Sequence, residues 1–141
     1  MPKECFKEHP CGNQWTALEL PDIVHMKLQG KVTLEECRML NEAHLSYGKE
    51  VPYFFYLIDL TELDDLPPAV RKEASETVKV LPLRGTVVYG APLKAKILAK
   101  LLMTAVNLFK GGKNQNQVEF TETESEARAW LDRRRRELAA A

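Results

Sequence analysis

The chain has 141 residues, of which 45% are hydrophobic and 28% are charged, and its 20 basic and 20 acidic side chains give a net charge of zero. This length and balance suit one globular domain with its own core, and they argue against a nucleic-acid-binding protein, which needs a wide basic face. The sequence contains no run of about 18 apolar residues, so we expect no membrane-spanning helix.

The start of the chain gives little sign of regular structure. Residues 1–13 carry two prolines and a glycine without a clear period, and we interpret them as a flexible leader to a domain at residues 14–141. They lack a basic start followed by an apolar segment, so we expect no secretory signal. Cys5, Cys11 and Cys37 form a sparse, odd set, which favours free thiols and a cytoplasmic protein over a disulfide scaffold.

The first regular pattern is a hairpin followed by a helix. Residues 15–20 and 23–29 alternate between apolar and polar side chains around a Pro-Asp turn, which predicts two antiparallel strands. Thr33 with Glu36 three positions later is the capping box of a helix. Gly48 is its predicted end, because glycine readily adopts the left-handed conformation that closes a helix.

A continuous apolar stretch forms the centre of the sequence. Residues 53–58 are all aromatic or aliphatic, which is typical of a strand buried on both faces in a sheet covered by helices. Asp59 stands at its predicted carboxyl end. We expect Asp64 or Asp65 to cap the next helix, with Pro67 in its first turn.

The second half of the chain alternates strands and helices. The patterns predict strands at residues 86–89 and 117–121, with a helix at residues 93–109 between them. Thr123 and Glu126 form a second capping box, which opens the last helix. We expect this helix to turn three side chains inward: Ala127, Trp130 and Leu131. The whole predicts a single α/β domain with a mixed sheet and about four helices, in the order β-β-α-β-α-β-α-β-α.

This order and spacing resemble the STAS domain, and more closely the SpoIIAA-like group of small bacterial proteins, which is related by fold to CRAL-TRIO lipid-binding domains. The matching stretches are Leu28 to Thr33, Tyr56 to Leu60 and Phe120 to Leu131. The resemblance implies a non-catalytic regulatory or protein-interaction module without a cofactor. Antagonists of this kind carry a phosphorylated serine after the central strand. Residues 64–69 contain no hydroxyl here, and Thr61 comes too early, so we expect no such switch.

Clustered acids follow the central strand. Asp59, Glu62, Asp64 and Asp65 crowd this predicted loop, which also contains Thr61. The four carboxylates are candidates for acid–base chemistry or for binding a hard cation. The simpler interpretation, which we favour, is that the acids cap a helix and gain from its dipole. The spacing of the cysteines and histidine near the start matches no zinc pattern, so we expect no metal.

His44 and Tyr47 lie on the apolar face of the first predicted helix. A histidine in such a position is usually a hydrogen-bonded core residue. The alternative is that the two side chains line a ligand pocket.

The third predicted helix carries more apolar surface than one sheet face can cover, since a helix on a sheet needs only a stripe of about 100°. The candidate ligand or partner surface comprises Leu98, Leu102, Phe109, Lys96 and Lys100. Residues 84–118 hold six bases and no acid. This combination predicts a homodimer contact, an unidentified protein partner or weak association with an anionic membrane.

Because the sequence shows no catalytic motif, we expect a non-enzymatic regulatory or interaction module. The alternative is a carrier of a lipid or another small apolar molecule, favoured by the third helix and by fold analogy.

Overall fold

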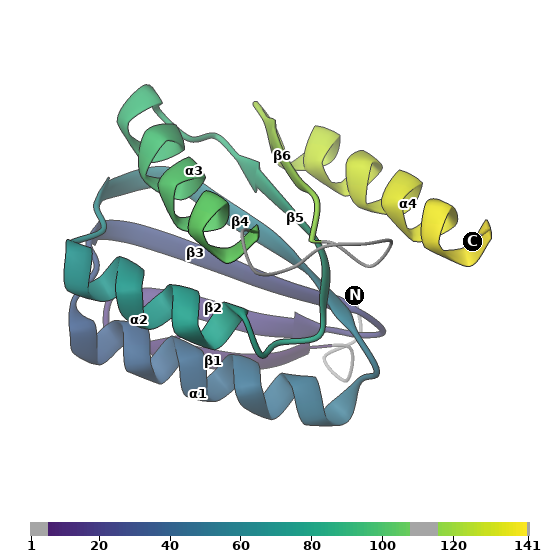
Figure 1. Ribbon diagram of the computed structural model, residues 1–141, viewed down its shortest axis with the longest axis horizontal. Helices are drawn as coiled ribbons and strands as arrows, with labels where there is room; N and C mark the ends of the chain where they lie inside the picture. Colours follow the sequence, from purple (N-terminus) through teal and green to yellow (C-terminus); the bar gives the residue numbers. More distant parts are fainter. Residues whose placement is uncertain (1–5, 108–115, 141) are drawn as a thin grey trace.

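The computed structural model describes residues 6–107 and 116–140. Within them, six strands form one sheet and four helices cover it (Figure 1). The strands are β1 (Phe6–Cys11), β2 (Gln14–Glu19), β3 (Ile23–Lys31), β4 (Phe54–Asp65), β5 (Leu83–Tyr89) and β6 (Val118–Thr121), and the helices are α1 (Leu34–Glu50), α2 (Pro68–Val78), α3 (Leu93–Asn107) and α4 (Glu124–Ala140). The predicted α/β order is confirmed, with one further strand, β1, before it.

The strands lie in the sheet in the same order as in the sequence. β1, β2 and β3 are antiparallel neighbours, whereas β3, β4, β5 and β6 run parallel. Helices α1, α2 and α3 connect the parallel strands and form one layer, while α4 packs on the opposite face (Figure 1). The sheet is therefore mixed, as predicted.

Strand β4 is covered from both sides, which confirms the interpretation of the apolar stretch. Phe54, Tyr56 and Ile58 belong to the larger core between the sheet and α1–α3. Phe55 and Leu57 point the other way, into the smaller core beneath α4. All five side chains are buried, so successive residues of one strand supply both cores.

The predicted capping box at the start of α1 is present and does more than cap. The Thr33 hydroxyl accepts the N–H of Glu36, and the Glu36 carboxylate accepts the N–H of Thr33. The same buried carboxylate accepts the Asn13 N–H at 2.7 Å and the Gln14 amide at 3.2 Å. Burial alone would raise the pKa of Glu36, but these hydrogen bonds outweigh it and lower the pKa. One ionised group thus joins the helix start to the β1–β2 turn.

Strand β1 corrects the interpretation of residues 1–13 as a flexible leader where it covers them, at Phe6–Cys11, and residues 1–5 lie outside the described residues. It pairs along its length with β2 through a two-residue turn, Gly12-Asn13, where Gly12 has a φ of 64°. The Tyr47 hydroxyl also donates to the carbonyl of Lys7 at 2.8 Å. The strand was missed because its side chains do not alternate clearly, although the Gly-Asn pair is a hairpin signal.

Gly48 does not end the first helix, contrary to the prediction. Helix α1 continues to Glu50 and ends at Val51, which is extended. Pro52 follows, and a residue before proline is disfavoured in the helical conformation. Gly48 instead lies against Pro82, where an added Cβ would approach the proline ring to 3.2 Å.

The predicted aspartate cap of the second helix is also wrong. Strand β4 extends to Asp65, because its last residues still pair with the end of β3 and the Asp65 carbonyl accepts the N–H of Val32 at 3.1 Å. The residue at the N-cap of α2 is Pro67, which has no side-chain cap. Asp59, Thr61 and Asp64 consequently lie within the strand and not in a loop after it.

Helix α4 packs closely on β5. Ala127 and Leu131 are fully buried, and Trp130 is half-buried against the same core. An added Cβ at Gly85 would lie 3.2 Å from the Trp130 ring, so the glycine permits this close approach. The predicted inward positions are therefore right, although Leu131 is more completely enclosed than Trp130.

We expect Leu131→Ala to lower the free energy of unfolding by about 2–5 kcal/mol, because it removes a buried side chain and leaves a cavity. The matched control is Leu93→Ala on α3, where the leucine is 75% exposed and the expected change is within about 0.5 kcal/mol. Urea denaturation measures both. Equal effects of the two substitutions would contradict the docking of α4 through Leu131.

Candidate functional site

Helix α3 turns two alanines and a methionine to the sheet and three larger aliphatic side chains to solvent. It begins after the turn at Gly90, whose φ is 70°. Its inner face consists of buried side chains four positions apart: Ala95, Ala99 and Met103. Its outer face exposes three apolar side chains at the same spacing, 75% of Leu93, 51% of Ile97 and 53% of Leu101. We call these three residues the α3 stripe.

The predicted members of this surface take different places. Leu98 is half-buried against the larger core, and Leu102 is half-buried at the edge of an internal cavity. Lys96 lies 3.8 Å from Glu122, and Lys100 is exposed, with Nζ 5.3 Å from the centre of the Phe120 ring. The last predicted member, residue 109, lies outside the described residues.

The sequence predicted an apolar surplus on this helix but not which side chains form it. The apolar arc of this helix is so wide that the helix could be rotated about its axis to several positions and still bury a similar number of apolar side chains against the sheet. The small side chains resolve the choice, because Ala95 and Ala99 let the helix backbone approach the sheet closely. This alanine spacing was the available signal for the α3 stripe.

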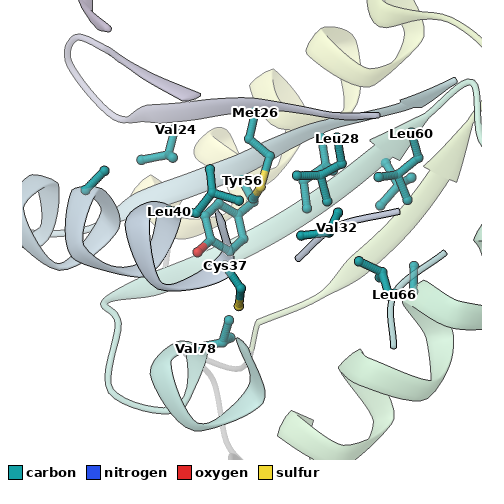
Figure 2. Packing of buried hydrophobic residues seen from close by; sticks show 14 of the residues in the cluster. Val24, Met26, Leu28, Val32, Cys37, Leu40, Tyr56, Leu60, Leu66 and Val78 are labelled. Atoms are coloured by element: carbon teal, nitrogen blue, oxygen red, sulfur yellow. The ribbon is translucent and has the colours of Figure 1, made fainter. Parts of the chain in front are cut away.

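The larger core is incompletely filled. Side chains of β3 and β4, among them Met26, Leu28 and Tyr56, point toward Cys37 of α1 and Val78 of α2 (Figure 2). Between these layers lies a cavity of about 80 Å³, which is also bounded by α3. The fold thus contains an internal apolar space next to the helix that carries the α3 stripe.

His44 lies in the wall of this cavity. It is also the hydrogen-bonded core residue that we favoured. Its Nε2 is 3.0 Å from the Thr16 hydroxyl of β2, and its Nδ1 is 2.8 Å from the Tyr56 hydroxyl of β4. Burial, reinforced by the charge of His9, lowers the pKa of His44 to about 3. The neutral imidazole therefore joins α1 to two strands.

Tyr47 does not join His44 at the cavity. Its ring is fully buried against β1, where its hydroxyl lies 2.6 Å from Nδ1 of His9 and donates to a backbone carbonyl. Burial, with nearby negative groups, raises its pKa. Tyr47 therefore anchors the edge strand, and only one of the two predicted pocket residues lines the cavity.

The acidic residues of β4 do not converge on one site. The Asp59 carboxylate accepts the backbone N–H and the hydroxyl of Thr61, at 2.9 and 2.6 Å. Asp64 is exposed and lies 4.0 Å from Lys94, while Asp65 is paired with the end of β3. In the described part of the chain, no group of three or more His, Cys, Asp or Glu residues is arranged to hold a metal ion.

The sequence analysis missed a polar ring beneath α4. His25 Nδ1 lies 3.2 Å from the Glu19 carboxylate, and His25 Nε2 lies 2.9 Å from the Tyr89 hydroxyl. Arg128 of α4 binds both oxygens of Glu19, at 2.8 and 2.9 Å, and donates to Glu124. Tyr89 donates to Glu124 at 3.3 Å, which closes the ring. Of these contacts, the sequence could have predicted the one between the side chains of Glu19 and His25, because both lie on the predicted hairpin.

The polar ring attaches α4 to the sheet, and pKa shifts keep its tyrosine protonated and its buried glutamate ionised. Burial, followed by the charges of Asp59 and Glu124, raises the pKa of Tyr89, so its phenol stays protonated near neutral pH. Burial would raise the pKa of Glu19, but hydrogen bonds from His25 and Arg128 outweigh it and bring the pKa to about 2. The ionised Glu19 therefore serves as a fixed acceptor for the arginine.

Comparison with solved structures identifies the fold. The chain is similar to an uncharacterised protein of the DUF3478 family with a SpoIIAA-like fold from Shewanella loihica PV-4, with a TM-score of 0.58 and 18% identity over 89% of this chain and 91% of that one. No protein-family model and no curated protein matches the sequence. The fold is therefore SpoIIAA-like, as the resemblance implied. None of the helices in residues 6–107 and 116–140 has the length and apolar character needed to cross a bilayer.

The buried His44 makes a prediction about pH. The folded protein keeps His44 neutral down to a pH of about 3, whereas the unfolded chain takes up a proton below its ordinary pKa of 6.5. Between these values the unfolded state binds more protons, so the contribution of His44 to the free energy of unfolding falls as pH falls.

We expect this contribution to change by at most about 1.4 kcal/mol per pH unit. Urea denaturation at a series of pH values from 4 to 7 should therefore show a steeper pH dependence for the wild type than for His44→Gln, which keeps a polar group but does not titrate. Parallel curves for the two proteins would contradict a neutral, buried His44.

Proposed function

We propose that this protein is a non-catalytic interaction module that binds its partner through the α3 stripe. The observation that carries this proposal is the exposure of Leu93, Ile97 and Leu101 in one row, while the opposite side of the same helix is buried. A row of large exposed apolar side chains marks a contact surface more often than scattered ones do. The SpoIIAA-like fold is compatible with this role but does not specify it.

The charges beside the α3 stripe define the chemistry of the partner. Lys94 and Lys100 are exposed beside it, and Lys96 is half-buried. The ion pair of Lys94 with Asp64 is long and solvent-exposed, so it neutralises little of the charge. Because α3 itself contains no acid, a complementary surface combines apolar side chains with carboxylates.

The same charges oppose self-association through this helix. In a two-fold symmetric dimer the same patch contacts itself, so the lysines of one copy would face those of the other. Like charges in such a contact cost binding free energy. We therefore favour a different protein with an acidic surface over the predicted homodimer, and over an anionic membrane, which three lysines would hold only weakly at about 1 kcal/mol each.

The test is affinity capture from the native host with the wild type and with Ile97→Glu. The substitution places a carboxylate in the middle of the α3 stripe, so we expect at least a tenfold loss of a salt-sensitive protein partner, about 1.4 kcal/mol. The matched control is Val80→Glu, since Val80 is 71% exposed in the turn after α2 and is not part of α3.

Two further measurements separate the alternatives. Analytical ultracentrifugation of the wild type reports a dimer, and flotation with vesicles containing anionic lipid reports membrane binding. If the wild type is a dimer and Ile97→Glu dissociates it, the partner of the α3 stripe is a second copy of the chain and not an acidic protein. If Ile97→Glu captures the same amount of partner protein as the wild type, the α3 stripe is not the surface that binds it.

A second function, binding of a small apolar molecule, is favoured by the internal cavity. Its wall is formed largely by aliphatic side chains of the sheet and of α1–α3, and its volume is about 80 Å³. Apolar cavities of this kind are costly to leave empty and accept apolar guests. Native mass spectrometry of the purified protein would show a bound mass if the protein carries such a molecule, and only the mass of the chain if it does not.

A further inference from the structure

The polar groups deep in the cavity have partners within the protein. Both ring nitrogens of His44 are hydrogen-bonded, one to Thr16 and one to Tyr56. The side-chain amide of Asn41 donates to the sulfur of Cys37 at 3.7 Å. Buried groups that are already paired gain little from a ligand. The inner part of the cavity therefore offers packing surface, and it suits a hydrocarbon chain.

One cation belongs to the cavity wall. Among the described residues that line the cavity, Arg71 of α2 is the one with a permanent charge. Its Nε donates to the carbonyl of Leu66 at 3.0 Å, which fixes the side chain near the start of the helix. None of the acidic side chains in residues 6–107 and 116–140 forms an ion pair with it. The guanidinium retains donors for an anion.

Arg71 also borders a surface groove between α2 and α3. This groove measures about 150 Å³, and the described residues that line it are Arg71, Lys72, Ser75, Leu101 and Leu102. Arg71 and Leu102 belong to both the groove and the cavity. The cation thus stands where an internal apolar space meets a surface depression with a second cation, Lys72.

We propose that this site binds an aliphatic carboxylic acid, with its hydrocarbon chain in the cavity and its carboxylate on the guanidinium of Arg71. A guanidinium presents paired donors that match the two oxygens of a carboxylate. The proposal deepens the second function above and rests on it. The cavity of about 80 Å³ and the groove of about 150 Å³ each lie below the ~300–1,000 Å³ of typical ligand pockets, so the ligand is a single chain of modest length and not a two-chain lipid.

The test is calorimetric titration with octanoate, kept below its critical micelle concentration, and with octanol, kept below its solubility limit. The two ligands share a chain and differ in the charge of the head. We expect octanoate to bind at least ten times more tightly than octanol at low salt, about 1.4 kcal/mol. Added salt should reduce the difference, because part of it is electrostatic.

Two variants assign the two ends of the ligand. Arg71→Gln keeps an N–H donor for the Leu66 carbonyl but removes the charge, so it should lose the tenfold preference for octanoate and still bind octanol. Ala74→Leu adds a larger side chain at the cavity wall and should abolish binding of both ligands without lowering Tm. Arg133→Gln, at an exposed position of α4, is the matched control and should bind as wild type does.

The outcomes separate this inference from the function on which it rests. Equal affinities for octanoate and octanol, or an Arg71→Gln variant that retains the preference, would overturn the assignment of the carboxylate to Arg71 while apolar binding stands. Absence of binding by both ligands to the wild type would overturn apolar binding as well. If a folded Ala74→Leu variant binds both ligands as the wild type does, the hydrocarbon chain of the ligand does not lie in the cavity.

Discussion

The structure depends on the first half of strand β4, which has no polar face. Because consecutive residues of β4 point to opposite sides of the sheet and all of Phe54 to Ile58 are buried, both sides must be covered. Among the described elements, the three crossover helices cover one side and the C-terminal helix α4 covers the other. The positions of the cavity, the α3 stripe and the polar ring all follow from this division.

The two sides are held by different interactions. On the side of α1–α3 the contacts are mainly apolar, with His44 and Glu36 as buried polar connections from α1 to the antiparallel strands. On the other side a single helix cannot cover the sheet, so α4 combines a small apolar core with charged contacts. Arg128 and Arg135 reach beyond that core to Glu19 and Asp22 near the β2–β3 turn.

The sequence predicted those features that short stretches of chain determine. The apolar run of β4, the capping box of α1 and the order of elements were all within reach, because each depends on neighbours in sequence. Strand β1 was not, because backbone pairing with β2 and the anchoring Tyr47 define it more than its side-chain pattern does. The ends of α1 and β4 were missed for the same reason, since Pro52 and pairing with β3 decide them.

The sequence indicated an apolar surplus on the third helix but not which of its side chains are exposed. Composition and spacing indicated excess apolar surface and positive charge on the third helix, while the rotation of that helix on the sheet decided which leucines are exposed. The polar ring brings together positions 19, 25, 89, 124 and 128, and only a tertiary structure places these side chains in contact. Arg71 at the mouth of the cavity was likewise invisible in the sequence, because nothing in the pattern of α2 marks it.

The arginine contacts of α4 also bear on how the chain folds. Since the sheet keeps the order of the sequence, each new strand pairs with the one before it, and every step closes only a short loop. The contacts of Arg128 with Glu19 and of Arg135 with Asp22 instead join residues 109 and 113 positions apart. They close loops of 109 and 113 residues, whose closure costs more entropy than that of any strand connection, and they tie the last helix to the β2–β3 hairpin.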